Sequence, residues 1–73
     1  MTEEMYHIEL VDPEGVRVFR RLSLRSHSAA LVREQAIRTL RRAHAPGSRI
    51  RGAEGVRVLD GAGYELFLAK AHD

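Results

Sequence analysis

The chain has 73 residues, with 44% apolar and 30% charged side chains, which is the length and composition of one small globular domain, here residues 1–73. The absence of cysteine excludes disulfide bonds, thiolate metal ligands and a cysteine nucleophile. No apolar run approaches the roughly 20 residues that span a bilayer, and the acidic start is unlike a signal peptide, so we expect a cytoplasmic protein without membrane contact. The net charge is +2, but eleven arginines make residues 16–57 strongly basic.

The first segment of the chain predicts a β-hairpin. Residues 5–11 alternate in polarity, which places Tyr6, Ile8 and Leu10 on one face of a strand. The sequence Asp-Pro-Glu-Gly at 12–15 has the chemistry of a turn, because proline presets the second turn position and glycine tolerates positive φ.

The returning strand is expected over residues 16–22. Val16 and Val18 are expected to face the core. Phe19 interrupts this alternation, so we expect a β-bulge near residues 20–21.

One amphipathic helix is predicted after this hairpin. Ser26 or Ser28 is the expected N-cap, and the helix continues to about His44. Pro46 ends it, because proline cannot extend a helix. A rotation of about 100° per residue collects the apolar side chains in one stripe. The stripe consists of Ala29, Val32, Ala36, Ile37, Leu40 and Ala43.

A second hairpin follows in the sequence. Strands are expected over residues 55–59 and 64–69, joined by an Asp-Gly turn at 60–63. The side chains expected to face the core are Val56, Val58, Tyr64, Leu66 and Leu68. The order hairpin, helix, hairpin predicts an α+β domain in which an antiparallel four-stranded sheet (ββαββ) carries one helix packed on one face.

The pentapeptide Glu-Gly-Val-Arg-Val occurs twice, at residues 14–18 and 54–58. A true repeat would place both copies in equivalent elements. Here the first copy leads into the second strand of its hairpin, and the second copy leads into the first. We therefore interpret the pentapeptide as a shared turn-to-strand sequence and not as a duplication.

The spaced alanines of the helix, Ala29, Ala36 and Ala43, and the closing hairpin from Val56 to Leu68 carry a resemblance. In these features the chain resembles a group of small uncharacterised bacterial proteins, found in rhizobial and related proteobacterial genomes, that contain a domain of unknown function. The resemblance covers most of the chain and implies the hairpin–helix–hairpin fold. It implies no activity and no catalytic residue.

Patterns typical of catalysis or metal binding are missing from the sequence. The histidines, at positions 7, 27, 44 and 72, lack the i, i+4 spacing of a helical zinc pair. Residues 47–52 have the glycine spacing of a phosphate-binding loop, but Ala53 and Glu54 stand where such loops continue with lysine and a hydroxyl residue. We therefore expect no enzymatic activity, no metal and no cofactor.

The sheet face turned away from the helix is the expected functional surface, because two phenylalanines, a leucine and three arginines are not an ordinary solvated face. This candidate interaction face consists of Arg17, Phe19, Arg21, Arg57, Leu59 and Phe67. Our first interpretation is a self-associating protein-interaction module, forming a homo-oligomer or binding another protein. Cross-strand ion pairs are expected within the hairpins, Arg17 with Glu9 and Arg57 with Glu65.

Three alternatives stay open. The same face is also suited to nucleic acid, with phenylalanines stacking on unpaired bases and arginines contacting phosphates. A candidate basic track would extend it, consisting of Arg38, Arg41, Arg42, Arg49 and Arg51. The chain could instead be a small inhibitor or an antitoxin-like partner of a larger complex, or its arginines could serve solubility alone.

Overall fold

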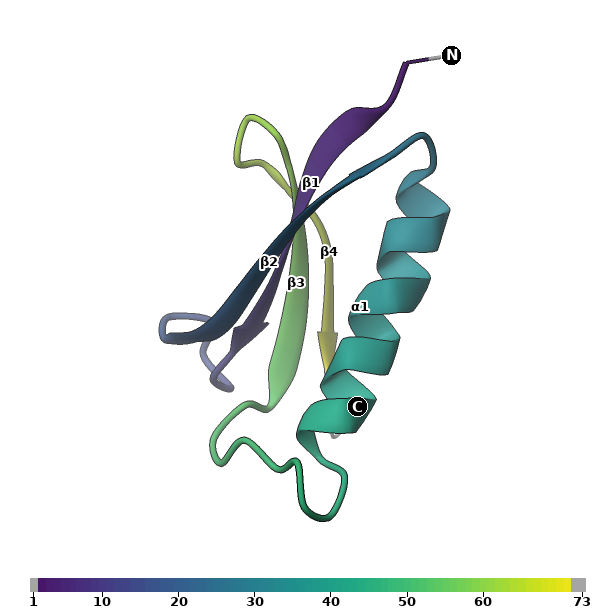
Figure 1. The fold of residues 1–73 in the computed structure, drawn as a ribbon. Coiled ribbons are helices and arrows are strands. Elements are labelled where there is room, and N and C mark those ends of the chain that lie inside the picture. Colours follow the sequence, from purple (N-terminus) through teal and green to yellow (C-terminus); the bar gives the residue numbers. More distant parts are fainter. Residues whose placement is uncertain (1, 72–73) are drawn as a thin grey trace.

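The computed structural model describes residues 2–71; the predictions that involve Met1, His72 and Asp73 lie outside the described residues. The elements are β1 (Glu4–Val11), β2 (Val18–Ser26), α1 (Ala29–Ala43), β3 (Gly55–Asp60) and β4 (Glu65–Lys70). All strand pairs are antiparallel in the order β2-β1-β3-β4, and α1 lies across one face of the sheet (Figure 1). The predicted α+β, ββαββ fold is confirmed.

Strand β1 is central because it pairs with a strand on each side. Ile8 lies opposite Leu22 of β2 and opposite Val58 of β3. Tyr6, Ile8 and Leu10 are buried in one apolar core with α1, as their alternation predicts. The helix contacts mainly β3 and β1, so the middle of the sheet is covered more completely than its edges.

Helix α1 confirms the predicted periodicity and resolves its start. Ser28 is the N-cap, with an extended backbone and a side-chain oxygen that accepts a hydrogen bond from the backbone N–H of Leu31 at 3.4 Å. The buried helix residues are Val32, Ala36, Leu40 and Ala43. The other two members of the predicted stripe are less covered, since Ile37 is half-buried and Ala29 is exposed.

The start of β2 differs from the prediction. Val16 is 81% exposed, and Val18 is also exposed, so their predicted inward orientation is wrong. The pairing shifts between Leu10 and Val11 of β1, which lie opposite Arg20 and Val18. Phe19 is therefore the extra residue of the bulge, and its ring packs against the core beside the loop that follows α1.

Strand β4 also corrects the predicted orientation. Phe67 lies opposite Val58 and Ala69 lies opposite Val56, so these two face the helix. The predicted inward residues are exposed: Tyr64, Leu66 and Leu68. The cause is a register shift beside Leu59, because a slip of one residue moves every side chain of a strand to the other face.

We expect Gly52→Ala to lower the free energy of unfolding more than Gly47→Ala, by about 1 kcal/mol. Both glycines have positive φ, +91° and +84°, so both substitutions introduce backbone strain. A Cβ at position 52 would lie 2.9 Å from Cζ of Phe19, whereas one at position 47 would meet nothing within 4 Å. Urea unfolding monitored by circular dichroism measures the difference. Equal losses would contradict the packing of Phe19 against this loop.

Candidate interaction surfaces

A buried carboxylate occupies the centre of the open face, the side of the sheet turned away from α1. Glu9 of β1 is only 6% exposed. Its Oε1 accepts hydrogen bonds from Nε and Nη2 of Arg57 at 3.0 and 2.7 Å, and its Oε2 lies 3.6 Å from Nη1 of Arg21. Both arginines lie directly opposite Glu9 on the neighbouring strands. This arrangement compensates the charge that β1 buries.

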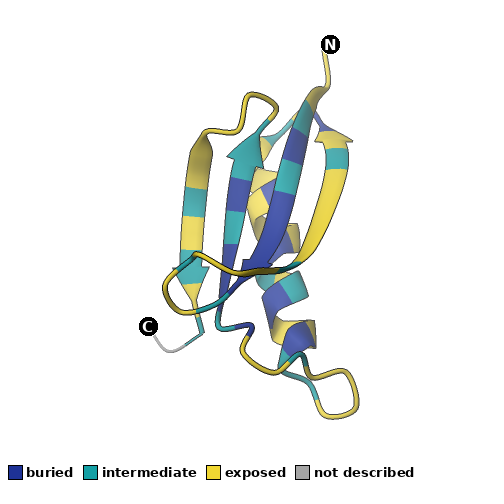
Figure 2. Cartoon of the chain, turned by 90° about the vertical axis from the view of Figure 1, so that its left-hand side faces the viewer, coloured by how far each residue is buried: buried dark blue, intermediate teal, exposed yellow. Residues whose placement is uncertain are grey.

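Arg57 also holds the β1–β2 loop, residues 12–17, against the open face. Its Nη1 donates a hydrogen bond to the carbonyl oxygen of Gly15 at 3.1 Å and lies 4.0 Å from Oε1 of Glu65. The loop crosses in front of the sheet, and Val11 beneath it is fully buried (Figure 2). The centre of the open face is thus a covered and paired polar cluster.

The structure splits the candidate interaction face predicted from the sequence. Three of its members lie on the open face, namely Arg21, Arg57 and Leu59. The two phenylalanines do not, and their predicted placement there is wrong. Phe67 faces α1, where the guanidinium of Arg33 lies 4.6 Å from the centre of its ring. Phe19 packs beside Gly52, and the guanidinium of Arg17 lies 4.7 Å from its ring centre.

Of the two predicted cross-strand ion pairs, Arg57 with Glu65 is present and Arg17 with Glu9 is not. Glu9 pairs with Arg21 and Arg57, not with Arg17, because the bulge places Arg17 before β2 begins. Arg57 lies opposite Leu68 in β4, and its 4.0 Å approach to Glu65 is the longest of its contacts. The stronger partner of Arg57 therefore comes from β1, through the pairing of strands from different hairpins.

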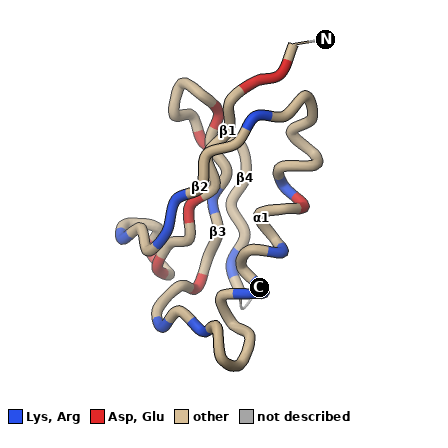
Figure 3. The backbone as a smooth tube through the Cα atoms, in the orientation of Figure 1, with Lys and Arg blue, Asp and Glu red and all other residues tan. Residues whose placement is uncertain are grey.

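The residues of the candidate basic track are exposed, and they lie on α1 and in the loop that follows it (Figure 3). It does not form one continuous surface. Arg42 lines a groove between α1 and β2, whereas Arg41 lines a groove between α1 and β4 on the other flank of the helix. Arg49 and Arg51 are exposed in the loop between α1 and β3. Arg20 is not among the site residues predicted from the sequence, yet it joins Arg42 in the first groove. Its orientation depends on the bulge, which the sequence pattern does not place exactly.

The two grooves arise because α1 covers the middle of the sheet and leaves its edges open. The α1–β2 groove has a volume of about 330 Å³. The α1–β4 groove has a volume of about 380 Å³ and is lined by Ile37, Leu40, Arg41, His44, Ala69, Lys70 and Ala71. Each is bounded by an edge strand on one side and the helix on the other.

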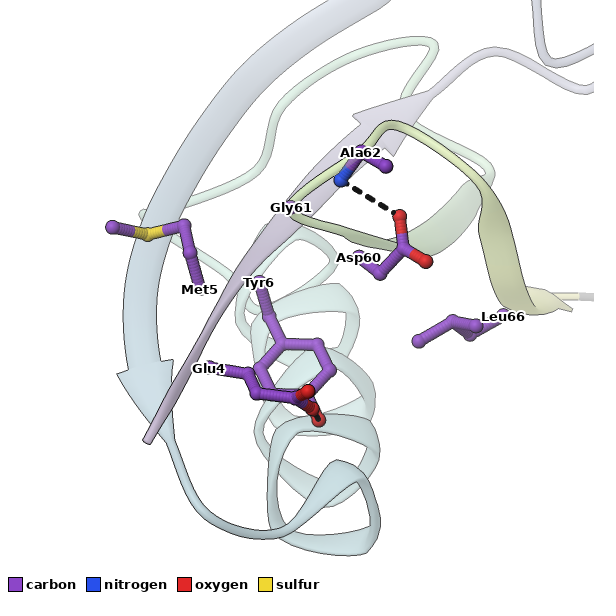
Figure 4. Close-up of a pocket in the computed structure, with 7 residues that line it drawn as sticks. All are labelled: Glu4, Met5, Tyr6, Asp60, Gly61, Ala62 and Leu66. Atoms are coloured by element: carbon purple, nitrogen blue, oxygen red, sulfur yellow. Dashed lines mark hydrogen bonds between the residues drawn. The ribbon is translucent and has the colours of Figure 1, made fainter. Parts of the chain in front are cut away.

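A third hollow, of about 460 Å³, lies at the turn between β3 and β4 (Figure 4). The Tyr6 phenol donates a hydrogen bond to Oε2 of Glu4 at 3.1 Å. Burial, together with the nearby carboxylates of Glu4 and Asp60, raises the pKa of Tyr6 above its ordinary value of 10.0. Oδ1 of Asp60 accepts hydrogen bonds from the backbone N–H groups of Ala62 and Tyr64, so this carboxylate stabilises the turn.

Two of the described histidines, His7 and His44, have local partners. Nδ1 of His7 lies 2.8 Å from Oγ of Ser23, and Nε2 of His44 lies 2.6 Å from the carbonyl oxygen of Ala53 and 3.3 Å from Oε2 of Glu54. Within residues 2–71, histidines and carboxylates nowhere gather in the groups of three that could hold a metal ion. No helix in the described part of the chain is long and apolar enough to cross a membrane.

Comparison with protein families, with curated proteins and with solved structures finds no match to this chain. The resemblance to small bacterial proteins that the sequence suggests therefore stays a prediction.

We expect Glu9→Gln to lower the free energy of unfolding by about 1–3 kcal/mol, because the substitution removes the charge that compensates Arg57 and Arg21. Chemical denaturation at neutral pH measures the loss. Glu34→Gln is the matched control, since Glu34 lies exposed on α1, and its effect is expected within about 0.5 kcal/mol. Equal effects of the two substitutions would contradict a stabilising role of the Glu9 cluster.

Tyr6 should make the free energy of unfolding depend on pH in the alkaline range. Its pKa is raised in the fold, so the unfolded chain ionises first as pH increases. Its contribution is fully present below the ordinary pKa of 10.0 and is lost as pH rises through the raised folded value. Urea unfolding at a series of alkaline pH values should show a decrease in the free energy of unfolding. This decrease should be smaller in Tyr6→Phe and unchanged in Tyr64→Phe. An unchanged pH profile in Tyr6→Phe would contradict the assignment.

Proposed function

We propose that this protein is a small non-enzymatic protein-interaction module that self-associates through edge strand β4. The observation that supports this proposal is the composition of the edge. Between Glu65 and Lys70, β4 has four uncharged residues, Leu66–Ala69. Leu66 is 50% exposed and Leu68 is 42% exposed. An apolar edge strand with free backbone groups is a template for pairing with another chain.

The opposite edge has different chemistry. Strand β2 carries Arg20, Arg21 and Arg25 within its length. Charged side chains along an edge oppose pairing with a second chain, because two copies would bring like charges together. The contrast between the two edges favours β4 as the surface of association. The covered polar cluster around Glu9 does not favour the centre of the open face.

Backbone directions indicate a register for the pair. The N–H of Ala71 donates to the carbonyl oxygen of Glu54 at 2.8 Å, toward β3. Backbone groups alternate in direction along the regular part of a strand, so those of residues 68 and 70 point toward the free edge. A two-fold axis at Leu68 then pairs each copy's Leu66 with the partner's Lys70. The same register places Phe67 opposite the partner's Ala69, a large side chain beside a small one.

The two-fold register also accounts for the apolar flank beside α1. Both helices lie on the same face of the resulting continuous sheet, so the α1–β4 grooves of the two copies adjoin. Their apolar residues Ile37 and Ala69 would become more deeply buried. The ends of antiparallel strands meet in opposite order, so Glu65 of each copy comes near Lys70 of the other. This charge complementarity supports a second copy as the occupant.

Light scattering over a concentration series tests the association. We expect a mass approaching twice 8.2 kDa for the unmodified chain and the monomer mass for Leu68→Lys, because two lysines would face each other at the two-fold axis. Leu31→Lys is the matched control, since Leu31 is 51% exposed on α1, and this variant should still associate. A monomer at every concentration, or an associating Leu68→Lys, would overturn the proposal.

Oxidative cross-linking tests the register. Leu68→Cys should form a disulfide-linked dimer, since residues opposite each other in a hydrogen-bonded antiparallel pair have Cα atoms about 5.5 Å apart. The chain has no other cysteine, so every cross-link reports this position. Lys70→Cys is the control, because position 70 faces position 66 of the partner in this register. Faster cross-linking at position 70 than at position 68 would contradict the register.

A second function, nucleic-acid binding, is favoured by the exposed arginines Arg38, Arg41, Arg42, Arg49 and Arg51, none of which forms an ion pair within residues 2–71. Two features count against it. The arginines are divided between both flanks of α1. In addition, each phenylalanine ring already makes a cation–π contact with an arginine of the chain itself. The aromatic platform that would stack on bases is thereby occupied. Salt-dependent binding of a single-stranded oligonucleotide tests this function.

A further inference from the structure

The α1–β2 groove combines an apolar floor with a cationic rim. Its volume is about 330 Å³. The apolar residues that line it are Leu10, Leu22, Ala43 and Ile50, and the polar ones are Arg20, Thr39, Arg42 and Ser48. Leu22 is still 39% exposed, so the floor is incompletely covered by the protein's own side chains.

The two arginines approach this groove from different elements, Arg20 from β2 and Arg42 from the last turn of α1. Neither forms an ion pair with a carboxylate among residues 2–71. This contrasts with Arg21 and Arg57 on the open face, which share Glu9. Two guanidinium groups that line one groove favour an anionic ligand there.

The hydroxyl groups extend the polar rim. The Thr39 hydroxyl donates a hydrogen bond to the carbonyl oxygen of Gln35 at 2.9 Å. Toward a ligand in the groove, Oγ1 can therefore act only as a hydrogen-bond acceptor. A peptide backbone N–H can donate to such an oxygen, whereas a phosphate oxygen cannot, so this acceptor does not add to the binding of phosphates.

We propose that the α1–β2 groove binds a short acidic and apolar peptide segment of a partner protein. Its carboxylates would pair with Arg20 and Arg42, and its aliphatic side chains would cover Leu22 and Ile50. The aliphatic lining has no aromatic ring on which a base could stack, which further separates this groove from single-strand-binding surfaces.

This proposal does not depend on self-association. β2 and β4 are opposite edges of the sheet, so pairing of two β4 strands would leave both α1–β2 grooves uncovered. In that case the two grooves lie at the outer edges of the combined sheet, and one dimer could hold two segments of the same partner.

Fluorescence anisotropy with a labelled peptide of alternating glutamate and leucine tests the groove. We expect binding at low salt, at least tenfold weaker binding for Arg20→Gln and for Arg42→Gln, and at least tenfold weaker binding of a peptide with glutamine in place of glutamate. Arg25→Gln and Arg38→Gln are matched controls, because Arg25 and Arg38 are exposed and do not line this groove; they should leave binding within about twofold.

A second measurement keeps the test independent of folding defects. In ¹⁵N-edited spectra of the unmodified chain, the glutamate–leucine peptide should shift the amide signals of Thr39, Ser48 and Ile50 more than those of Leu66 and Leu68. The proposal is overturned if the peptide does not bind, or if all four arginine substitutions weaken its binding equally. It is also overturned if an oligonucleotide displaces the bound peptide at a lower concentration than the unlabelled peptide does. Leu68→Lys should bind the peptide normally, which separates this result from the test of self-association.

Discussion

A single helix lies over a sheet of four strands, and the two differ in width. A helix with its side chains is about 10 Å across, whereas the outer strands of a four-stranded sheet lie about 14 Å apart. Helix α1 therefore covers the middle strands β1 and β3, which bury Ile8, Val56 and Val58 almost completely. The edge strands extend beyond the helix on both sides. Both grooves follow from this mismatch.

The other face of the sheet is stabilised in a different way, because no second layer of secondary structure among residues 2–71 covers it. The strand β1 places Glu9 at the centre of this face, and two arginines from neighbouring strands compensate its charge. Arg57 binds Glu9 and also the carbonyl oxygen of Gly15, so the same side chain joins two strands and one loop. A fixed loop then covers Val11, which gives a small domain additional buried surface.

The strong periodicity of apolar residues made the helix and β1 predictable. The orientation of side chains in the edge strands β2 and β4 was not predictable, because it depends on strand pairing and not on local sequence. The pentapeptide Glu-Gly-Val-Arg-Val shows this directly: Val16 of the first copy is 81% exposed, and Val56 of the second is fully buried. The first copy lies in a loop up to its last residue, which begins β2, whereas the second enters a strand paired on both sides. A bulge at Phe19 and a register shift beside Leu59 reversed the predicted faces of both phenylalanines. Local pattern cannot fix such shifts, because the pairing partners decide them.

The unequal chemistry of the two edges bears on the form that the proposed self-association would take. If both edges were apolar, β4 of one copy could pair with β2 of the next. This contact would repeat from copy to copy without closing, and a filament would form. The arginines of β2 oppose repeated sheet extension at that edge, since each added strand would have to accommodate Arg20, Arg21 and Arg25. Pairing of β4 with a second β4 uses the one apolar edge of each copy and leaves none for further growth. The same arginine that protects the β2 edge, Arg20, also lines the α1–β2 groove, so a charge that prevents sheet extension is available to bind an acidic segment.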